Sequence, residues 1–593
     1  MNCAIVSRKL AFLGSLALLL SLTANAIAAE PAAAARRAAD LFPASAVAYA
    51  ELSEPGKLAE GILAHPLVAR ALMQPEAKQA LESPQYQQFR LVLGLVEAQM
   101  GMPWRDALKD VTGVYAAGDI KTEGVAVLIH AKKPETLTKL TTALLNLARL
   151  DAQRKSQPDP IQEGEYRGSK TYAAGEGRAA IHGNWLLLCN VESLAREVMD
   201  NLAADQPAAA TPTLAADGEF KSALATRGDS GIAWAWLRLG PLREKGPLAY
   251  LQSEKANDAG AEVLFGGLLS VLGKTPFITA TVQTKEDSLR VAIAVPHDPT
   301  WVRPARDFYF GAGSQGSAPP LLSVKNTLGA ISFHRDLSAI WTSSDELFND
   351  QDAAKVEQAD AGLSTFFSGK EFGKDILGQF EPGVQIVVAR QEFGPERQPA
   401  IKLPAAAIVL GLKETDKIDR QMRVSFQSLI GFLNIVGAQN GQSQLELHNE
   451  KRDGAEYNWA SYAPGETTPQ DPGRLHDNFS PSLVIVGKRM IVASTIDLAT
   501  ELAKATPAPA AASARRSNFA ISVDGPAIVD ALRENRQHLV AQNVLEKGNS
   551  EERAGKEIDL ALEIASWLSR ANIELSIADG QLRLDAAVKI TKP

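Results

Sequence analysis

The chain of 593 residues contains only two cysteines, Cys3 and Cys189. Cys3 lies in a segment that we expect to be removed on export, so Cys189 has no partner for an intramolecular disulfide. Cys189 ends the apolar run Trp185–Cys189, where a buried, unreactive thiol is favoured over a nucleophile. The scarcity of cysteine excludes a disulfide framework and leaves the stability of the fold to core burial.

The chain also has no excess of basic residues: 61 Lys and Arg stand against 69 Asp and Glu, for a net charge of -8. Loss of Arg8 and Lys9 with a leader peptide would take the net charge to about -10. Binding to nucleic acid or to an anionic membrane requires a concentrated basic face. The composition therefore argues against nucleic acid as a partner.

Motifs that carry chemistry are missing as well. None of the eight histidines has another within four residues, and there is no His-Glu-x-x-His and no Gly-x-Ser-x-Gly. The segment Gly267–Thr275 resembles a phosphate-binding loop, but five residues separate its glycines where four are required. We therefore predict no catalytic, cofactor-binding or metal-binding residues and no cofactor.

The first residues have the layout of a cleaved secretion signal. Arg8 and Lys9 precede an apolar run, Leu10–Leu22, and Ala24-Asn-Ala26 and Ala26-Ile-Ala28 offer small residues for cleavage. We assign residues 1–28 to the signal peptide and residues 29–40 to a flexible lead-in. No later run is long enough to span a bilayer, so we expect a protein exported to the periplasm, the cell surface or the exterior.

Two segments of the chain align without a gap, Gly183–Ala195 and Gly487–Ala499. Each has a glycine turn, a short apolar strand, a polar stop and the start of a helix, and further matched segments follow the same order in both halves. This pattern indicates duplication of one long unit rather than an array of short repeats. We expect a first unit at residues 41–310, a linker at 311–320 and a second unit at 321–593.

Local patterns predict an α+β fold with mainly antiparallel sheets and amphipathic helices packed on one face. Strict alternation marks strands at Phe277–Val282, where Ile278, Ala280 and Val282 share one face, and at Ile573–Ile577. Asp579-Gly580 is typical of a tight hairpin turn. The helices show one apolar stripe each. One such stripe is formed by Ile418, Met422, Phe426, Leu429 and Leu433.

The most pointed polar cluster is His334-Arg335-Asp336, at the transition from a strand to a helix. We interpret Asp336 as the cap of a helix that begins at Leu337, with a ligand site as the alternative. Trp234 and Trp236 share one face of a strand, and we expect them in the core rather than as a platform for carbohydrate.

Three segments, Leu41–Leu52, Arg335–Trp341 and Ile401–Pro404, resemble large secreted bacterial proteins of unknown function that are common in planctomycete-type bacteria. The resemblance implies an exported bacterial protein. It implies no activity, substrate or site.

The leading hypothesis is an exported, non-catalytic binding or structural protein whose partner is an unknown envelope protein or polymer. Two alternatives stay open: a secreted hydrolase whose site is assembled from distant residues, and an exported chaperone or inhibitor that binds peptides at sheet edges.

Overall fold

The computed structural model describes residues 38–590 with gaps at 65–67, 70–71, 74, 205–211, 228–230, 246–247, 249–250, 252–254, 256–257, 286, 396, 464–470 and 507–515. The expected signal peptide, residues 1–28, lies outside the described residues. Two compact units are present. The first contains the residues up to Leu248 and Pro276–Ala294, and the second contains Ala249–Thr275 and Val295–Thr591.

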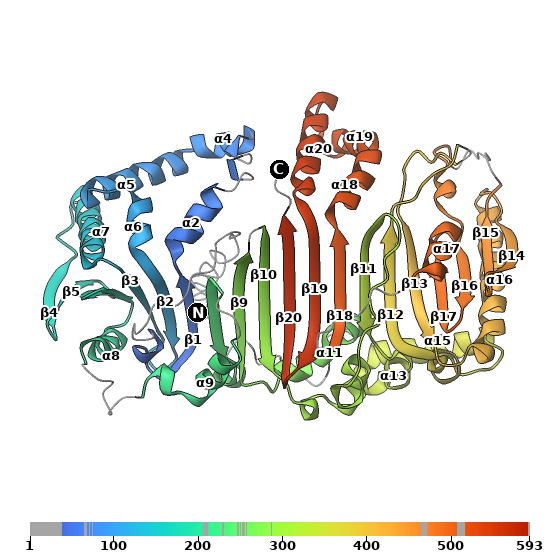
Figure 1. The fold of residues 1–593 in the computed structure, drawn as a ribbon, viewed down its shortest axis with the longest axis horizontal. Helices are drawn as coiled ribbons and strands as arrows, with labels where there is room; N and C mark the ends of the chain where they lie inside the picture. The colour runs from blue at the N-terminus through green and yellow to red at the C-terminus, as the bar shows by residue number, and fades with distance from the viewer. Residues whose placement is uncertain are drawn as a thin grey trace. The chain divides into compact units, whose positions relative to one another are not determined.

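The first unit contains an antiparallel sheet with the order β4-β5-β6-β7-β3-β2-β1-β8-β9-β10 (Figure 1). Its strands are β1 (Ala46–Ser53), β2 (Val111–Asp119), β3 (Gly124–Ala131), β4 (Gln162–Tyr166), β5 (Ser169–Ala174), β6 (Gly177–His182), β7 (Trp185–Cys189), β8 (Ala233–Arg238), β9 (Phe277–Lys285) and β10 (Ser288–Pro296). Its helices are α2 (Pro55–Ala64), α4 (Pro75–Glu82), α5 (Pro84–Met100), α6 (Trp104–Asp110), α7 (Pro134–Arg154), α8 (Glu192–Ala203), α9 (Gly218–Ala225) and α10 (Gly240–Lys245).

The second unit repeats this strand order, as β14-β15-β16-β17-β13-β12-β11-β18-β19-β20. Its strands are β11 (Thr327–His334), β12 (Phe380–Ala389), β13 (Ala405–Leu412), β14 (Glu446–Arg452), β15 (Ala455–Ser461), β16 (Ser482–Val486), β17 (Arg489–Ala493), β18 (Arg516–Asp524), β19 (Leu568–Ala578) and β20 (Gln581–Ile590). Its helices are α11 (Ala259–Leu272), α12 (Asp307–Phe310), α13 (Leu337–Thr342), α14 (Ser344–Leu347), α15 (Asp350–Phe366), α16 (Thr415–Gln439), α17 (Ile496–Lys504), α18 (Gly525–Glu534), α19 (Arg536–Lys547) and α20 (Glu551–Ser566).

The two units therefore combine antiparallel strands with helices, and the α+β class predicted from the sequence is confirmed. Gly183 and Gly487 occupy matched turns, between β6 and β7 and between β16 and β17, with φ of 53° and 55°. Equal strand order is what a duplication predicts. Descent of both units from one ancestor stays a proposal.

Helices cover both faces of the first unit's sheet, which differs from the single covered face expected from the sequence. Leu194 and Val198 of α8 pack with Leu187 of β7, whereas Leu137 of α7 packs with Leu186. Successive residues of a strand point to opposite faces. The continuous apolar run of β7 therefore belongs to a strand that is buried on both sides.

The hairpins form where the sequence predicted them. In the second unit Asp579 and Gly580 both have positive φ, 51° and 69°, and link β19 to β20 as a two-residue turn. In β9, however, the side chains of Thr279 and Thr281 are buried in the core, and the face that carries Ile278 is the less buried one. The register explains this reversal, because Thr279 and Thr281 pair with Trp236 and Trp234 on the same face.

Two expected connecting segments are partly built into the units. Ala38 and Ala39, at the end of the expected lead-in, are buried in the first core. The expected linker, Gly311–Pro320, lies within the second unit. There the Ser314 hydroxyl lies 2.9 Å from Nε2 of His297, and the Ser332 hydroxyl donates to the carbonyl of Pro319.

Candidate functional site

The polar cluster His334-Arg335-Asp336 has a structural role. Asp336 caps α13 as predicted, because its carboxylate accepts a hydrogen bond of 2.9 Å from the N–H of Ala339. Arg335 is buried, and its guanidinium lies 3.4 Å from the ring centroid of Tyr309. It donates to the carbonyls of Val263 and His334, so the cluster is committed to internal contacts.

The other residues singled out in the sequence are also internal. Trp234 and Trp236 are 1% exposed and pack edge-on against Phe220, as a core location predicts. Cys189 is buried, and its thiol donates to the carbonyl of Val191. Burial raises the pKa of this thiol. Gly267 lies inside helix α11 rather than in a phosphate-binding loop.

Several histidines pair with hydroxyl groups. The pairs are Thr112–His130 at 2.5 Å, Ser169–His182 at 2.7 Å, Ser314–His297 at 2.9 Å and Ser461–His448 at 3.0 Å. His476 instead bonds to the carboxylate of Asp471 at 2.7 Å. A hydrolytic triad needs one histidine joined to both a hydroxyl and a carboxylate. No histidine in the described part of the chain meets that condition.

A metal centre is not indicated either. Within the residues that the structure describes, no group of three His, Cys, Asp or Glu side chains could hold a metal ion.

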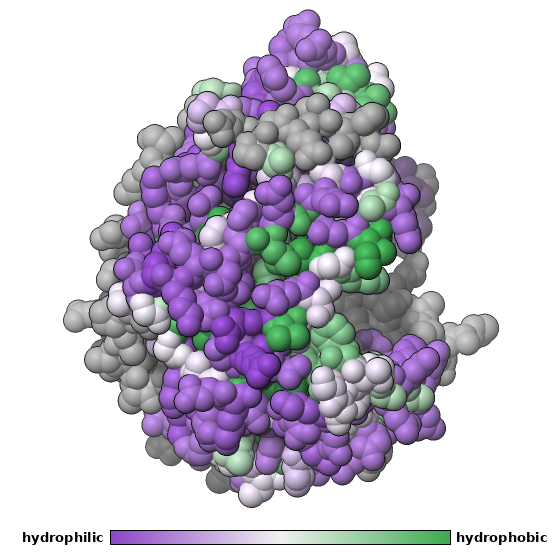
Figure 2. Space-filling model, turned by 90° about the vertical axis from the view of Figure 1, so that its right-hand side faces the viewer, coloured by the Kyte–Doolittle hydropathy of each residue, from purple (hydrophilic) through white to green (hydrophobic). Residues whose placement is uncertain are grey.

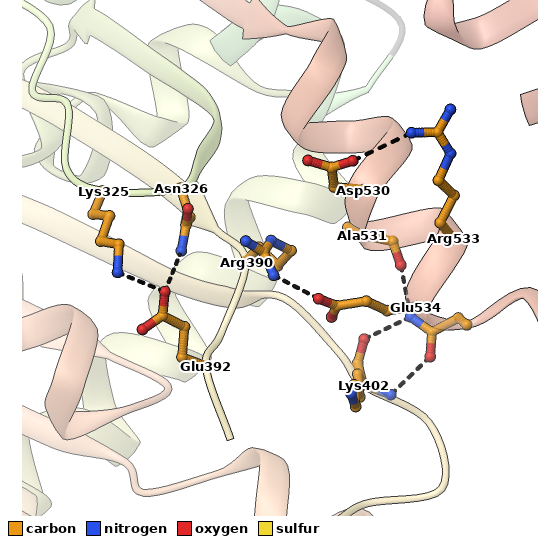
Figure 3. A network of polar contacts seen from close by, with 10 residues as sticks. Lys325, Asn326, Arg390, Glu392, Lys402, Asp530, Ala531, Arg533 and Glu534 are labelled. Atoms are coloured by element: carbon orange, nitrogen blue, oxygen red, sulfur yellow. Dashed lines mark hydrogen bonds and ion pairs between the residues drawn. The ribbon is translucent and has the colours of Figure 1, made fainter. Parts of the chain in front are cut away.

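A second polar network fastens a loop of the second unit (Figure 3). Asn535, next to the end of α18, accepts from the N–H of Lys402 at 2.8 Å and donates to the carbonyl of the same residue at 2.9 Å. Arg390 donates to Glu534 at 2.5 Å, and Glu392 accepts from Lys325 at 2.6 Å. The Asn535 and Arg390 contacts hold the connection between β12 and β13 against α18. Lys325 and Arg390 are both paired with carboxylates of the same unit.

A group of apolar side chains on α16, the helix of 25 residues that follows β13, is exposed rather than packed inside the unit. One side of α16 packs on the sheet through Ile418, Phe426 and Ile430. Asn434 fixes its C-terminal half, because it exchanges hydrogen bonds of 2.9 and 2.7 Å with the backbone of Leu445. The helix is thus held in place from the sheet side.

Around the rest of its circumference α16 exposes large apolar side chains, which we call the α16 outer face. Its members and their exposed fractions are Val424 (49%), Leu429 (49%), Phe432 (60%), Leu433 (41%), Ile435 (61%) and Val436 (37%). There is no Asp, Glu, Lys or Arg between Val424 and Asn440. A helix that is apolar all round is normally buried on all sides. Contiguous exposed apolar surface of this kind marks an interaction site.

Figure 2 views the end of the second unit that carries α16 and β14. It shows apolar side chains gathered in the middle of a mostly hydrophilic face.

The matched helix of the first unit is covered where α16 is open. Leu137 and Ile418, each the fourth residue of its helix, are both buried against the sheet. From that common reference, Ala143 of α7 matches Val424 of α16. Ala143 is fully buried in a cluster that includes Val96 and Met100 of α5, whereas Val424 is 49% exposed. In the first unit a helix thus occupies the direction in which the α16 outer face is open.

The first unit has a second exposed apolar surface, on α5. Phe89, Leu91, Val92 and Leu95 are 59%, 65%, 41% and 40% exposed. Arg90 lies within this run. The α5 surface is therefore interrupted by charge, and the α16 outer face is the stronger candidate.

The sequence prediction for α16 was partly wrong. Ile418 and Phe426 are buried as predicted, but Leu429 and Leu433 are exposed and Ile430 is buried instead. The signal that could have found the site is the uncharged run Val424–Asn440, which has apolar residues in every direction around the helix. Assigning only one apolar stripe to such a run overlooks the apolar residues on the other sides of the helix.

No protein-family model matches the sequence, and no curated protein matches it. Solved structures that resemble the chain include crystal forms IV and III of TP0453. Each is 10% identical, with TM-scores of 0.22 and 0.23, over 43% and 45% of this chain and 79% and 81% of the other.

None of the described helices combines the length and the apolar character that crossing a membrane requires.

Proposed function

We propose that this chain is an exported, non-catalytic binding protein of the cell envelope or exterior and that the α16 outer face is its binding surface. The observation that carries the proposal is the uncharged second side of α16, with Phe432 and Ile435 each about 60% exposed. Export is supported by the charged start, apolar run and small-residue cleavage sites of residues 1–28.

The hydrolase alternative has less support. The hydroxyl–histidine pairs described above lack a carboxylate on the second ring nitrogen among the described residues, and Cys189 is a buried thiol with a raised pKa.

Peptide binding at sheet edges has less support as well. β4 and β14, which each form one end of a strand order, carry several exposed charges, among them Glu163, Glu165, Glu450 and Lys451. Charged side chains on an edge strand oppose pairing with a further strand.

A site-specific photo-crosslinker tests the proposal. A benzophenone amino acid replaces Phe432 in the protein exported by living cells, and a control carries it at Leu545, a lone exposed apolar residue of α19 at 84% exposure. We expect a discrete adduct from position 432 and none from position 545. Absence of an adduct at 432, or equal adducts from both positions, would contradict a binding role for this surface.

A binding assay with substitutions supplies the second measurement. Replacing Phe432 with Ser should weaken binding of the crosslinked partner by about 30-fold, the effect of truncating an aromatic anchor worth about 2 kcal/mol. Leu545→Ser should leave the affinity unchanged. Because Phe432 is 60% exposed, its substitution should not lower the melting temperature.

A further inference from the structure

We propose that the partner of the α16 outer face is the same face of a second copy of this chain, packed antiparallel about a twofold axis. This inference rests on the proposed binding role of α16. It adds the identity of the partner and the register of the contact.

The shape of the partner follows from the first unit. There the corresponding direction of α7 is filled by helix α5, through Val96 and Met100 against Ala143. Helices pack on one another when the side chains of one enter the gaps of the other. An α-helix with apolar side chains is therefore the shape that fits over α16.

The sequence of α16 is complementary to itself in the antiparallel direction. If the twofold axis passes at the height of residue 430, a residue n positions after 430 in one copy lies opposite the residue n positions before 430 in the other copy. The opposed pairs nearest the contact line are then Ser428 with Phe432 and Ser425 with Ile435. In both pairs a large side chain meets a small one, and at the ends of the contact Val424 meets Val436. A twofold contact needs such self-complementarity, because the same patch serves both copies.

Charge also favours a second copy. The run Val424–Asn440 has no charged residue, so the part that pairs with itself about residue 430, Val424–Val436 over about 18 Å, brings no like charges together. The nearest cation, Arg423, already pairs with Asp419 and Glu456 of its own chain. An anionic membrane surface would instead favour a row of free cations beside the apolar face, and this run has none.

The first test is the association state of the protein purified after export. Sedimentation velocity from about 1 to 100 μM should show a dimer that dissociates on dilution, because a helix pair alone is a small interface. Phe432→Glu should weaken dimerisation by more than 30-fold, and Leu545→Glu should not. A monomer at every concentration, or a dimer unaffected by Phe432→Glu, overturns the proposal.

The second test fixes the register. In a Cys189→Ala background, Ser428→Cys protein is mixed with Phe432→Cys protein under mild oxidation. The mixed disulfide should form in preference to either homodisulfide, because opposed Cβ atoms must approach to about 4 Å. Random pairing overturns the register and with it the proposal.

The outcomes also separate this inference from the proposed function. A position-432 photo-adduct with the mass of two chains supports both. An adduct with a different macromolecule, or binding to neutral lipid vesicles that Phe432→Glu abolishes while the protein stays monomeric, overturns the dimer and leaves a binding role for α16. Absence of any adduct contradicts the binding role itself.

Discussion

Cys189 shows how a reactive residue type becomes a packing element. It lies on β7 opposite Ala126 of β3, and in the second unit the matched position is Ala493, opposite Ala407 of β13. Both sites are buried and small. The position therefore accommodates a small apolar side chain in both units.

We predict that Cys189→Ala lowers the free energy of unfolding by only about 1 kcal/mol, the cost of a small lost contact in a core. The thiol of the wild-type protein should react with a thiol reagent only after denaturant is added, because burial raises its pKa. Rapid labelling of the native protein would contradict a structural role. The labelling rate in denaturant serves as the control.

Two buried histidines make stability depend on pH. Burial lowers the pKa of His297 and of His334, and Arg335 lowers that of His334 further. Asp298 acts in the opposite direction on the pKa of His297, as do a backbone hydrogen bond with Ser317 and then Asp336 on that of His334. The unfolded chain then binds protons at a higher pH than the folded chain. The stability contributed by the neutral rings is complete above about pH 6.5 and falls as the pH drops below that value.

We therefore expect the free energy of unfolding to fall between pH 7.5 and 5.5 in urea titrations and His334→Gln to reduce the slope of that fall. His538 is exposed, so His538→Gln should leave the slope unchanged. A wild-type slope equal to that of His334→Gln would show that this ring does not contribute.

Residues whose role depends on near neighbours were predictable from the sequence. Asp336 precedes a helical pattern, and Asp579-Gly580 stands between alternating runs. Their roles follow from backbone chemistry within a few residues. Thr279 and Thr281 were not predictable, because their face is fixed by Trp234 and Trp236 on a strand some 45 residues away.

At the scale of elements, α16 likewise shows what could not be predicted from the sequence. Its apolar period identified a helix, but the sheet-facing side depends on which strands lie below it. The uncharged run leaves that choice open, and only the fold decides that Ile430 is buried and Leu429 is exposed. The proposed binding surface consists of the apolar side chains that remain exposed after that choice.

The connection between β12 and β13 provides an element-scale prediction. Asn535→Ala removes two hydrogen bonds to the backbone of Lys402 and one to the carbonyl of Ala531 (Figure 3), and we expect it to cost about 1–2 kcal/mol. Asp530→Ala is the matched control, since it breaks only the exposed pair with Arg533 at 3.5 Å and should cost less than about 0.5 kcal/mol. Equal effects in urea unfolding would show that Asn535 does not fasten the loop.

At the scale of the whole molecule, we propose that the two units descend from one duplicated ancestor. The equal order of ten strands in each unit supports this proposal, as does the gapless match between Gly183–Ala195 and Gly487–Ala499. The matched segments could be recognised from the sequence because turns and strand–helix junctions are local features. The place of residues 249–275 in the second unit could not be predicted, because it depends on contacts with residues far along the chain.

One such contact is a buried ion pair. Glu262 of α11 and Arg306 are 1% and 2% exposed, and Arg306 donates to both carboxylate oxygens, at 2.5 and 2.8 Å. Ser270 accepts a further hydrogen bond from Arg306 at 3.0 Å. Two-point contact between a guanidinium and a carboxylate fixes the geometry of both groups. The pair therefore connects α11 to the rest of the second unit.

We predict that Glu262→Gln destabilises the second unit by about 3–5 kcal/mol, because the buried guanidinium of Arg306 then loses the carboxylate that it contacts at two points. Replacing both residues with apolar ones, Glu262→Leu with Arg306→Met, should recover much of this loss, because no unpaired charge remains. Hydrogen exchange followed by mass spectrometry distinguishes the units: protection should fall in β11–β13 of Glu262→Gln and stay unchanged in β1–β3. Equal loss of protection in both sets of strands would contradict the assignment of α11 to the second unit, and a double variant as unstable as the single one would show that packing, rather than charge, makes this contact important.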